Sequence, residues 1–330
     1  MKGLDIGPRR ATGHTDLARL REGGVGAVFF AVYVSGDYAA KNQAAHRALE
    51  MIDTVRHDIV DRYPNYFTLA LTADDIERAH REGKVAALMG IEGGHAIEDS
   101  LRLLRSFYSL GIRYMTLTHS NTNNWADSSG DIGKAGVKSH DGLTDFGKSV
   151  VREMNRIGMM ADISHVSDKT FWDVLDVSTA PPFASHSSSR AISNIPRNMT
   201  DNMIAALAKK GGVVQINFGC EFLSQKSADT SSWSNPALKG QPASSTARAS
   251  LADAVAHIDH IRKLAGIGAV GIGSDFDGVP CVPVGLEDVS KFPALTAALK
   301  TAGYTDADIA KIYGGNLLRV MRAVEAARRQ

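Results

Sequence analysis

The chain has 330 residues, of which 44% are hydrophobic, and this is enough for one large domain or two small domains with a packed core. Its 37 basic and 36 acidic side chains leave a net charge of +1. This near balance argues against a broad basic surface of the kind that binds nucleic acid or an anionic membrane. No apolar run reaches the roughly 20 residues that cross a bilayer, and the residues after Met1 lack the apolar core of a signal peptide. We therefore expect a small-molecule partner and, for the chain as written, a cytoplasmic location; a periplasmic or secreted location would need an upstream signal.

Seven short apolar runs predict buried strands, and longer segments with helical spacing separate them. The predicted strands are 25–34, 84–93, 113–119, 158–165, 181–187, 212–218 and 268–278. Strict alternation of strands and helices is typical of repeated βα units around a parallel sheet.

The segments between the strands carry helix-start and helix-stop residues. Capping side chains followed by acids predict helices that begin after Thr72, Thr144, Ser167 and Thr200. Gly158 is expected to end one of them. Two long amphipathic helices are predicted at 251–264 and 306–328.

Two further features complete the organisation of the chain. Residues 224–250 are rich in Ser, Ala and Pro without a period, which predicts a long loop, either a surface excursion or a lid over an active site. Cys220 and Cys281 are far apart and form no C-x-x-C unit, so we expect two free thiols.

These elements predict a single domain over residues 1–330, a (β/α)8 TIM-type barrel of the metal-dependent hydrolase kind. A closed barrel of this type has eight strands, and only seven are predicted. Residues 1–24 contain no convincing strand, so the first strand is the one expected to be missing.

Polar side chains stand at the carboxyl ends of five predicted strands, on the face where barrel enzymes build their active sites. They are Glu92, His119, His165, His186 and Asp275, the last accompanied by Asp277. One such residue would mean little, but their recurrence on five strands indicates a catalytic site. For Asp275 and Asp277 a glycine-flanked turn, in which the aspartates bond their own backbone, is the alternative.

Imidazole and carboxylate donors at Glu92, His165 and His186 suit zinc or a similar divalent ion. Three protein ligands leave positions open for water and substrate. This predicts metal-assisted hydrolysis, in which a metal-activated hydroxide attacks a carbonyl and Asp275 carries the proton to the leaving amine.

The segments that hold these residues resemble the zinc-dependent membrane dipeptidases, the renal dipeptidase-like peptidase family M19. The similar stretches extend from about residue 12 to the end and include IEGGHAI, LGIRYMTLTHSNTNNWAD, MMADISHVSDKTFWDVL, ASHSSSRAISNIPRNMTDNMI and GIGSDFDGVP.

The resemblance implies a homodimeric barrel hydrolase that cleaves dipeptides, often with a D-residue at the C-terminal side, and uses up to two zinc ions. It implies that Glu92 bridges the ions and that His165 and His186 bind the second ion. His119 would contact the substrate and support the tetrahedral intermediate, Arg197 would grip the terminal carboxylate, and Asp275 would be the acid/base.

The family also has a His-x-Asp pair on its first strand, which binds the first zinc. His14 and Asp16 spell such a pair but belong to the segment that enters the second barrel unit, so we expect them not to be ligands. The first zinc site would then keep only Glu92. A truncated or catalytically impaired barrel with an incomplete metal centre, and another metal-dependent amidohydrolase, remain as alternatives to a dipeptidase.

Overall fold

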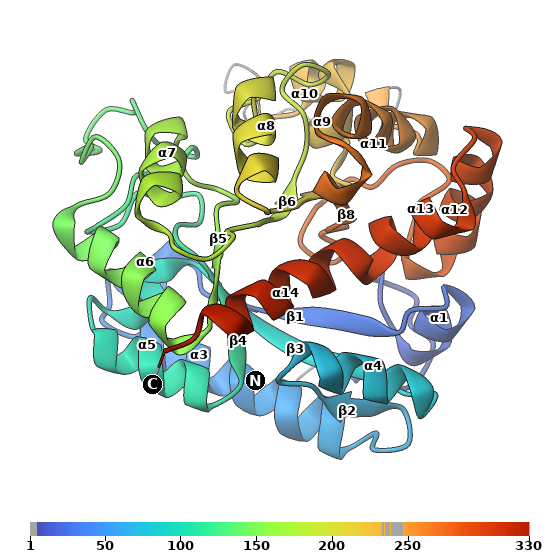
Figure 1. The fold of residues 1–330 in the computed structure, drawn as a ribbon, viewed down its shortest axis with the longest axis horizontal. Coiled ribbons are helices and arrows are strands. Elements are labelled where there is room, and N and C mark those ends of the chain that lie inside the picture. The colour runs from blue at the N-terminus through green and yellow to red at the C-terminus, as the bar shows by residue number, and fades with distance from the viewer. Residues whose placement is uncertain (1–4, 233, 235–237, 239–246, 330) are drawn as a thin grey trace. The chain divides into compact units, whose positions relative to one another are not determined.

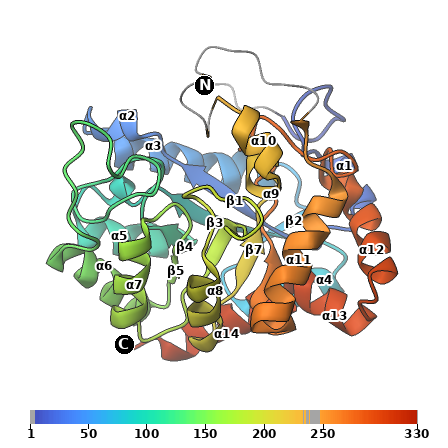
Figure 2. The ribbon, with the colours of Figure 1, turned by 90° about the horizontal axis from the view of Figure 1, so that it is seen from above.

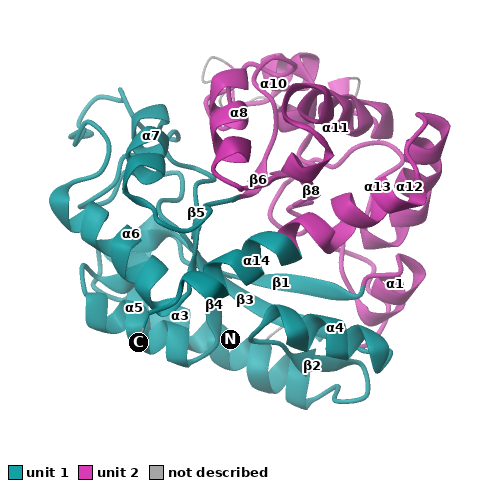
Figure 3. Ribbon diagram, in the orientation of Figure 1, with its two compact units in different colours: residues 1–5, 26–183, 318–330 teal, residues 6–25, 184–317 magenta. Residues whose placement is uncertain are grey.

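The computed structural model describes residues 5–232, 234, 238 and 247–329, and the chain divides into two compact units (Figure 3). Unit 1 comprises residues 1–5, 26–183 and 318–330, and unit 2 comprises residues 6–25 and 184–317. Both units are α/β with parallel strands, as the sequence predicts.

Unit 1 is built on a five-stranded parallel sheet. Its strands are β1 (Ala27–Tyr33), β2 (Phe67–Leu69), β3 (Val85–Glu92), β4 (Ile112–Thr116) and β5 (Met160–Asp162). β3 is the central strand: β1 pairs along one edge, and β2 and β4 share the other edge. β2 is a strand that the sequence analysis missed, because three residues are too few to show a period.

Helices cover this sheet, and neighbouring helices in the chain pack side by side, α5 on α6 and α6 on α7 (Figures 1 and 2). The helical segments of unit 1 are α2 (Gly36–Ala39), α3 (Ala44–Asp53), η1 (Thr54–Asp61), α4 (Ala73–Arg81), η2 (Gly94–Ile97), α5 (Leu101–Ser109), α6 (Asp145–Ile157), α7 (Asp168–Val177) and most of α14 (Asn316–Ala327). The predicted starts are confirmed, since the Thr72, Thr144 and Ser167 side chains each cap a helix. Gly158 ends α6 in the left-handed conformation, with φ 83°.

Unit 2 is built on a three-stranded parallel sheet in the order β6-β7-β8. Its strands are β6 (Ala184–Ser187), β7 (Val214–Ile216) and β8 (Val270–Ile272), and its helical segments are α1 (Leu17–Glu22), α8 (Asp201–Lys209), α9 (Cys220–Leu223), α10 (Gln225–Thr230), α11 (Leu251–Ala265), η5 (Ile267–Ala269), η6 (Val289–Lys291), α12 (Phe292–Thr301), α13 (Asp306–Ala310) and η7 (Lys311–Gly315). Thr200 caps α8 as expected. Among residues 5–26, no strand precedes β1, which agrees with the strand count from the sequence.

Two expectations about secondary structure need correction. The predicted loop 224–250 begins with helix α10, which Ser224 caps by accepting from the Ser227 backbone N–H; its middle, residues 235–237 and 239–246, lies outside the described residues. The predicted single helix 306–328 is interrupted by η7, where Gly314 departs from helical geometry. An amphipathic pattern persists across such a break because the apolar side chains still face one side.

The expectation of two free thiols is wrong, because Cys220 and Cys281 form a disulfide. Cys220 follows β7, and Cys281 lies in the loop after the neighbouring strand β8. Carboxyl ends of adjacent parallel strands meet at one edge of a sheet, so two residues 61 positions apart in sequence come to a Cα separation of 5.5 Å. The spacing of the two cysteines in the sequence does not by itself predict this disulfide.

Candidate functional site

The predicted site residues lie at or just beyond the carboxyl ends of β3, β4, β5, β6 and β8. Glu92 is the last residue of β3, and His186 lies within β6. His119, His165 and Asp275 each stand three residues beyond the end of their strand, which is β4, β5 or β8. The strand-end pattern read from the sequence is therefore present in the fold, at the ends where α/β proteins place their ligands.

Unit 1 brings Glu92, His119 and His165 together. His165 Nε2 lies 3.1 Å from Glu92 Oε1, and the two side chains are only 6% and 13% exposed. The His119 ring lies against His165 on one side, with centroids 4.4 Å apart, and against Tyr33 at 4.7 Å. A mostly buried carboxylate is thus in direct contact with a buried imidazole, and a second imidazole packs against that ring.

His165 is held in place through its backbone as well. Its φ of 69° lies in the left-handed region, which a non-glycine residue adopts only when its surroundings hold it there. The His165 carbonyl accepts from Ser129 N at 2.8 Å and from Ser129 Oγ at 2.9 Å. These bonds fix the direction in which the ring projects.

Unit 2 contributes His186 and Arg197, both buried. His186 Nδ1 lies 2.6 Å from Ser185 Oγ; when Nδ1–H donates, Nε2 keeps its lone pair for a metal ion. Arg197 Nη2 donates to the His186 carbonyl at 3.2 Å, and its guanidinium lies over the Phe222 ring at 5.1 Å. These two contacts hold the guanidinium beside the strand that carries His186.

Asp275 follows β8 and is oriented by a residue that the sequence analysis missed. Asn217, directly after β7, donates from Nδ2 to Asp275 Oδ2 at 2.9 Å. A polar residue directly after a buried strand was the available signal, the same one that indicated His119 and His165. Asp162, the buried last residue of β5, was missed as well and accepts from Thr116 Oγ1 at 2.5 Å.

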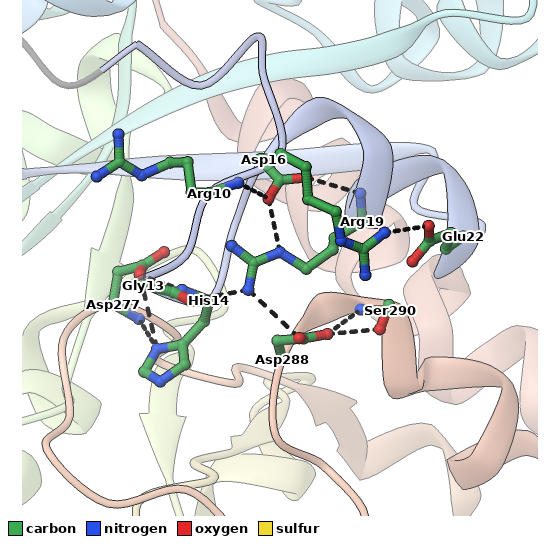
Figure 4. Close-up of polar contacts among 10 residues, drawn as sticks. Arg10, Gly13, His14, Asp16, Arg19, Glu22, Asp277, Asp288 and Ser290 are labelled. Atoms are coloured by element: carbon green, nitrogen blue, oxygen red, sulfur yellow. Dashed lines mark hydrogen bonds and ion pairs between the residues drawn. The ribbon is translucent and has the colours of Figure 1, made fainter.

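His14 and Asp16 both have structural partners within unit 2. The Asp16 carboxylate caps α1 by accepting from Arg19 N at 2.9 Å, and it pairs with Arg19 Nε at 2.7 Å. His14 bonds Asp277, so Asp277 does not merely bond its own backbone in a turn. Figure 4 shows both pairs.

Three further histidines, His95, His257 and His260, also have structural partners. His95 is buried and bonds the Val34 carbonyl at 2.8 Å, and burial holds its pKa below the ordinary value. His257 is buried on α11, accepts from Ser189 N at 3.0 Å and bonds the Leu223 carbonyl; burial lowers its pKa to about 4, so it is neutral at physiological pH. His260 pairs with Asp201 at 2.7 Å.

The described residues offer one group of three side chains that could hold a metal ion, namely Glu92, His165 and His186. The donor chemistry fits a borderline divalent ion such as zinc. Donors that lie 2.0–2.1 Å from a tetrahedral ion are about 3.3 Å from each other, and the Glu92–His165 separation of 3.1 Å is close to that value.

The chain is similar in sequence and fold to several proteins described as dipeptidases or metallopeptidases. The chain is 39% identical to an uncharacterized dipeptidase of Schizosaccharomyces pombe over 324 residues, which is 95% of this chain and 73% of that protein. It is 40% identical over 321 residues to dipeptidase verJ of Clonostachys rogersoniana, covering 94% of this chain and 76% of that protein. A metallopeptidase of Rhodobacter sphaeroides, solved with a phosphinate mimic of the dipeptide L-Ala-D-Ala, matches with a TM-score of 0.82 and 30% identity over 96% of this chain and 91% of that one.

The fold and the donor set thus define a metal-dependent dipeptidase, and the predicted fold class is confirmed. The model of one family, the membrane dipeptidases, matches residues 3–330. The chain belongs to this family, peptidase family M19. Among the described residues, no helix has the length and apolar character to cross a membrane.

Proposed function

We propose that this protein hydrolyses the peptide bond of dipeptides, including dipeptides with a D-residue at the C-terminal side, with a zinc ion held by Glu92, His165 and His186. The observation that carries the proposal is the buried contact of Glu92 with His165 beside the His119 ring. A bound divalent ion lowers the pKa of water toward neutrality and polarises a carbonyl oxygen. The phosphinate dipeptide mimic bound by the Rhodobacter sphaeroides relative supports a dipeptide as the substrate.

The protein's own residues would orient the substrate and move the proton. Arg197, planar and buried against Phe222, suits a bidentate grip on the free carboxylate of the dipeptide. His119 would donate to the oxygen that gains negative charge as water attacks. Asp275 would take the proton of the attacking water and give it to the leaving amine, with its carboxylate aimed by Asn217.

We propose a single filled metal site per chain. The bonds of Asp16 to Arg19 and of His14 to Asp277 engage both side chains, so we expect neither to join Glu92 as a ligand of a first ion. One carboxylate is too few for a tight site.

Elemental analysis combined with dipeptide hydrolysis tests the proposal. We expect one zinc per chain, release of amino acids from L-Ala-L-Ala and L-Ala-D-Ala, and loss of both metal and turnover in the Glu92→Gln and His165→Ala variants. His57→Ala is the matched control, because this histidine is 59% exposed on the π-helix η1. Metal retained at the wild-type level in both ligand variants, or no dipeptide hydrolysis by the zinc-loaded protein, would overturn the proposal.

The assembly and the compartment belong to the same proposal. We expect a homodimer, which light scattering after size exclusion would test by its mass. The Cys220–Cys281 disulfide favours an oxidising compartment over the cytoplasm. Trapping of free thiols in the source cells tests this, since two alkylated cysteines per chain would contradict it.

A further inference from the structure

The loop that carries Asp275 has an unusual backbone. Asp275 and Asp277 both have positive φ, 58° and 69°, and Gly278 N donates to the Asp275 carbonyl across this turn. Two left-handed aspartates so close together are unfavourable by themselves, and such conformations persist where neighbouring groups hold them. The neighbours of this loop therefore decide where the Asp275 carboxylate points.

Asp277 is clasped by His14 through two bonds that run in opposite directions (Figure 4). His14 N donates to Asp277 Oδ1 at 2.6 Å, and Asp277 N donates to His14 Nδ1 at 2.8 Å. The approach requires glycine at position 13: Gly13 has φ 78°, and a Cβ there would lie 2.9 Å from Asp277 Oδ1. Backbone and side chain of both partners thus take part in the clasp.

Phe276 and Asp275, the other two positions of this loop, also have partners. The Phe276 ring lies 5.8 Å from Phe218 and 5.5 Å from His14, measured between centroids. Asn217 accepts from Gly219 N at 2.6 Å through Oδ1, which directs its amide nitrogen to Asp275.

The segment that carries His14 is itself anchored. Arg19 pairs with Asp16 and donates from Nη1 to the Gly13 carbonyl at 2.8 Å and to Asp288 Oδ2 at 3.3 Å. The Asp16–Arg19 pair is buried, with 0% of the Asp16 and 6% of the Arg19 side chain exposed. These bonds therefore fix the backbone next to His14, and with it the position from which the His14 ring contacts the loop.

We infer that His14 is a positioning residue for the reaction: its clasp on Asp277 sets the loop conformation that aims the Asp275 carboxylate. The inference rests on the proposed function, in which Asp275 carries the proton. It also gives the His-x-Asp pair a role other than metal binding, because Asp16 anchors the segment while His14 grips the catalytic loop.

The test compares His14→Ala with His14→Asn in the zinc-loaded protein. The Asn side-chain oxygen sits where Nδ1 sits in histidine, so this variant keeps an acceptor for Asp277 N–H. We expect His14→Ala to lower kcat roughly 10- to 100-fold with KM and bound zinc within about twofold of wild type, since a small misplacement of a catalytic group has an effect of this size. His14→Asn should recover most of kcat, and His57→Ala, an exposed histidine of unit 1, should match wild type.

Hydrogen exchange of the peptide spanning 273–280 gives a readout that does not depend on activity. We expect faster exchange there in His14→Ala, unchanged exchange across α11, and protection restored in His14→Asn. If the wild type hydrolyses no dipeptide but the exchange results hold, the proposed function fails and the clasp stands. Unchanged exchange in His14→Ala, or an Asn variant that is no better than Ala in kcat, would overturn the inference.

Discussion

Reduction of the Cys220–Cys281 disulfide should destabilise the protein by an amount that depends on the length of the loop that the bond closes. The bond closes a loop with a sequence separation of 61 residues. In the loop-entropy description, opening such a loop raises the entropy of the unfolded chain by about 14 cal/mol/K, which corresponds to about 4 kcal/mol at 25 °C. With an unfolding entropy near 2.1 cal/mol/K per residue over 330 residues, this lowers Tm by about 6 °C.

The assay is thermal unfolding followed by circular dichroism, with and without a reductant, together with thiol titration of the denatured protein. We expect no reactive thiol before reduction and two after it, one from each cysteine of the chain. A Cys220→Ser, Cys281→Ser double variant is the control: it should show the lower Tm in both conditions. Two reactive thiols in the unreduced protein, or a Tm that reduction leaves unchanged, would refute the reasoning.

Three further predictions concern His257, Gly90 and Arg197. Burial lowers the pKa of His257 to about 4, so on acidification the unfolded state binds a proton before the folded state does. The neutral histidine's contribution to the free energy of unfolding is complete above about pH 6.5, and up to about 3 kcal/mol of it is lost by pH 4. Urea unfolding of the wild type between these pH values should show this loss, and His257→Asn should not. Gly90→Ala should lower the free energy of unfolding by about 1–3 kcal/mol, because its Cβ would lie 2.0 Å from Tyr114 Cζ, whereas Gly268→Ala, with open space around it, should not. Arg197→Lys should raise KM roughly tenfold for a dipeptide but leave it unchanged for the C-terminal amide, since a lysine lacks the planar fork.

Local signals in the sequence predicted much of this fold. The Thr144 and Thr200 hydroxyls accept from Gly147 N and Met203 N, so the helix starts depend on residues three positions apart. All seven predicted strands are present, because a buried parallel strand is apolar on both faces and stands out from its neighbours. Such features are encoded within a few residues and do not require knowledge of the tertiary structure.

Features that depend on distant partners were not predictable in this way. β2 exists because Phe67–Leu69 pairs with β3, and a run of three residues carries no period of its own. The disulfide follows from the pairing of β7 with β8, which brings the segments after them together. Asn217 carries the strand-end signal of the other site residues, but its partner Asp275 is 58 residues later, so its neighbours in the sequence do not indicate the bond between them.

The His-x-Asp pair shows why a motif needs its structural context. A metal ligand must present a lone pair toward a shared centre, and the same two residue types also serve as a helix cap and as a partner for a backbone N–H. Asp16 precedes α1, where a capping carboxylate is expected, and its oxygens bind Arg19. His14 follows a left-handed glycine that lets it approach Asp277. A left-handed glycine before the pair and a helix after it favour a structural role for His14 and Asp16 over metal binding.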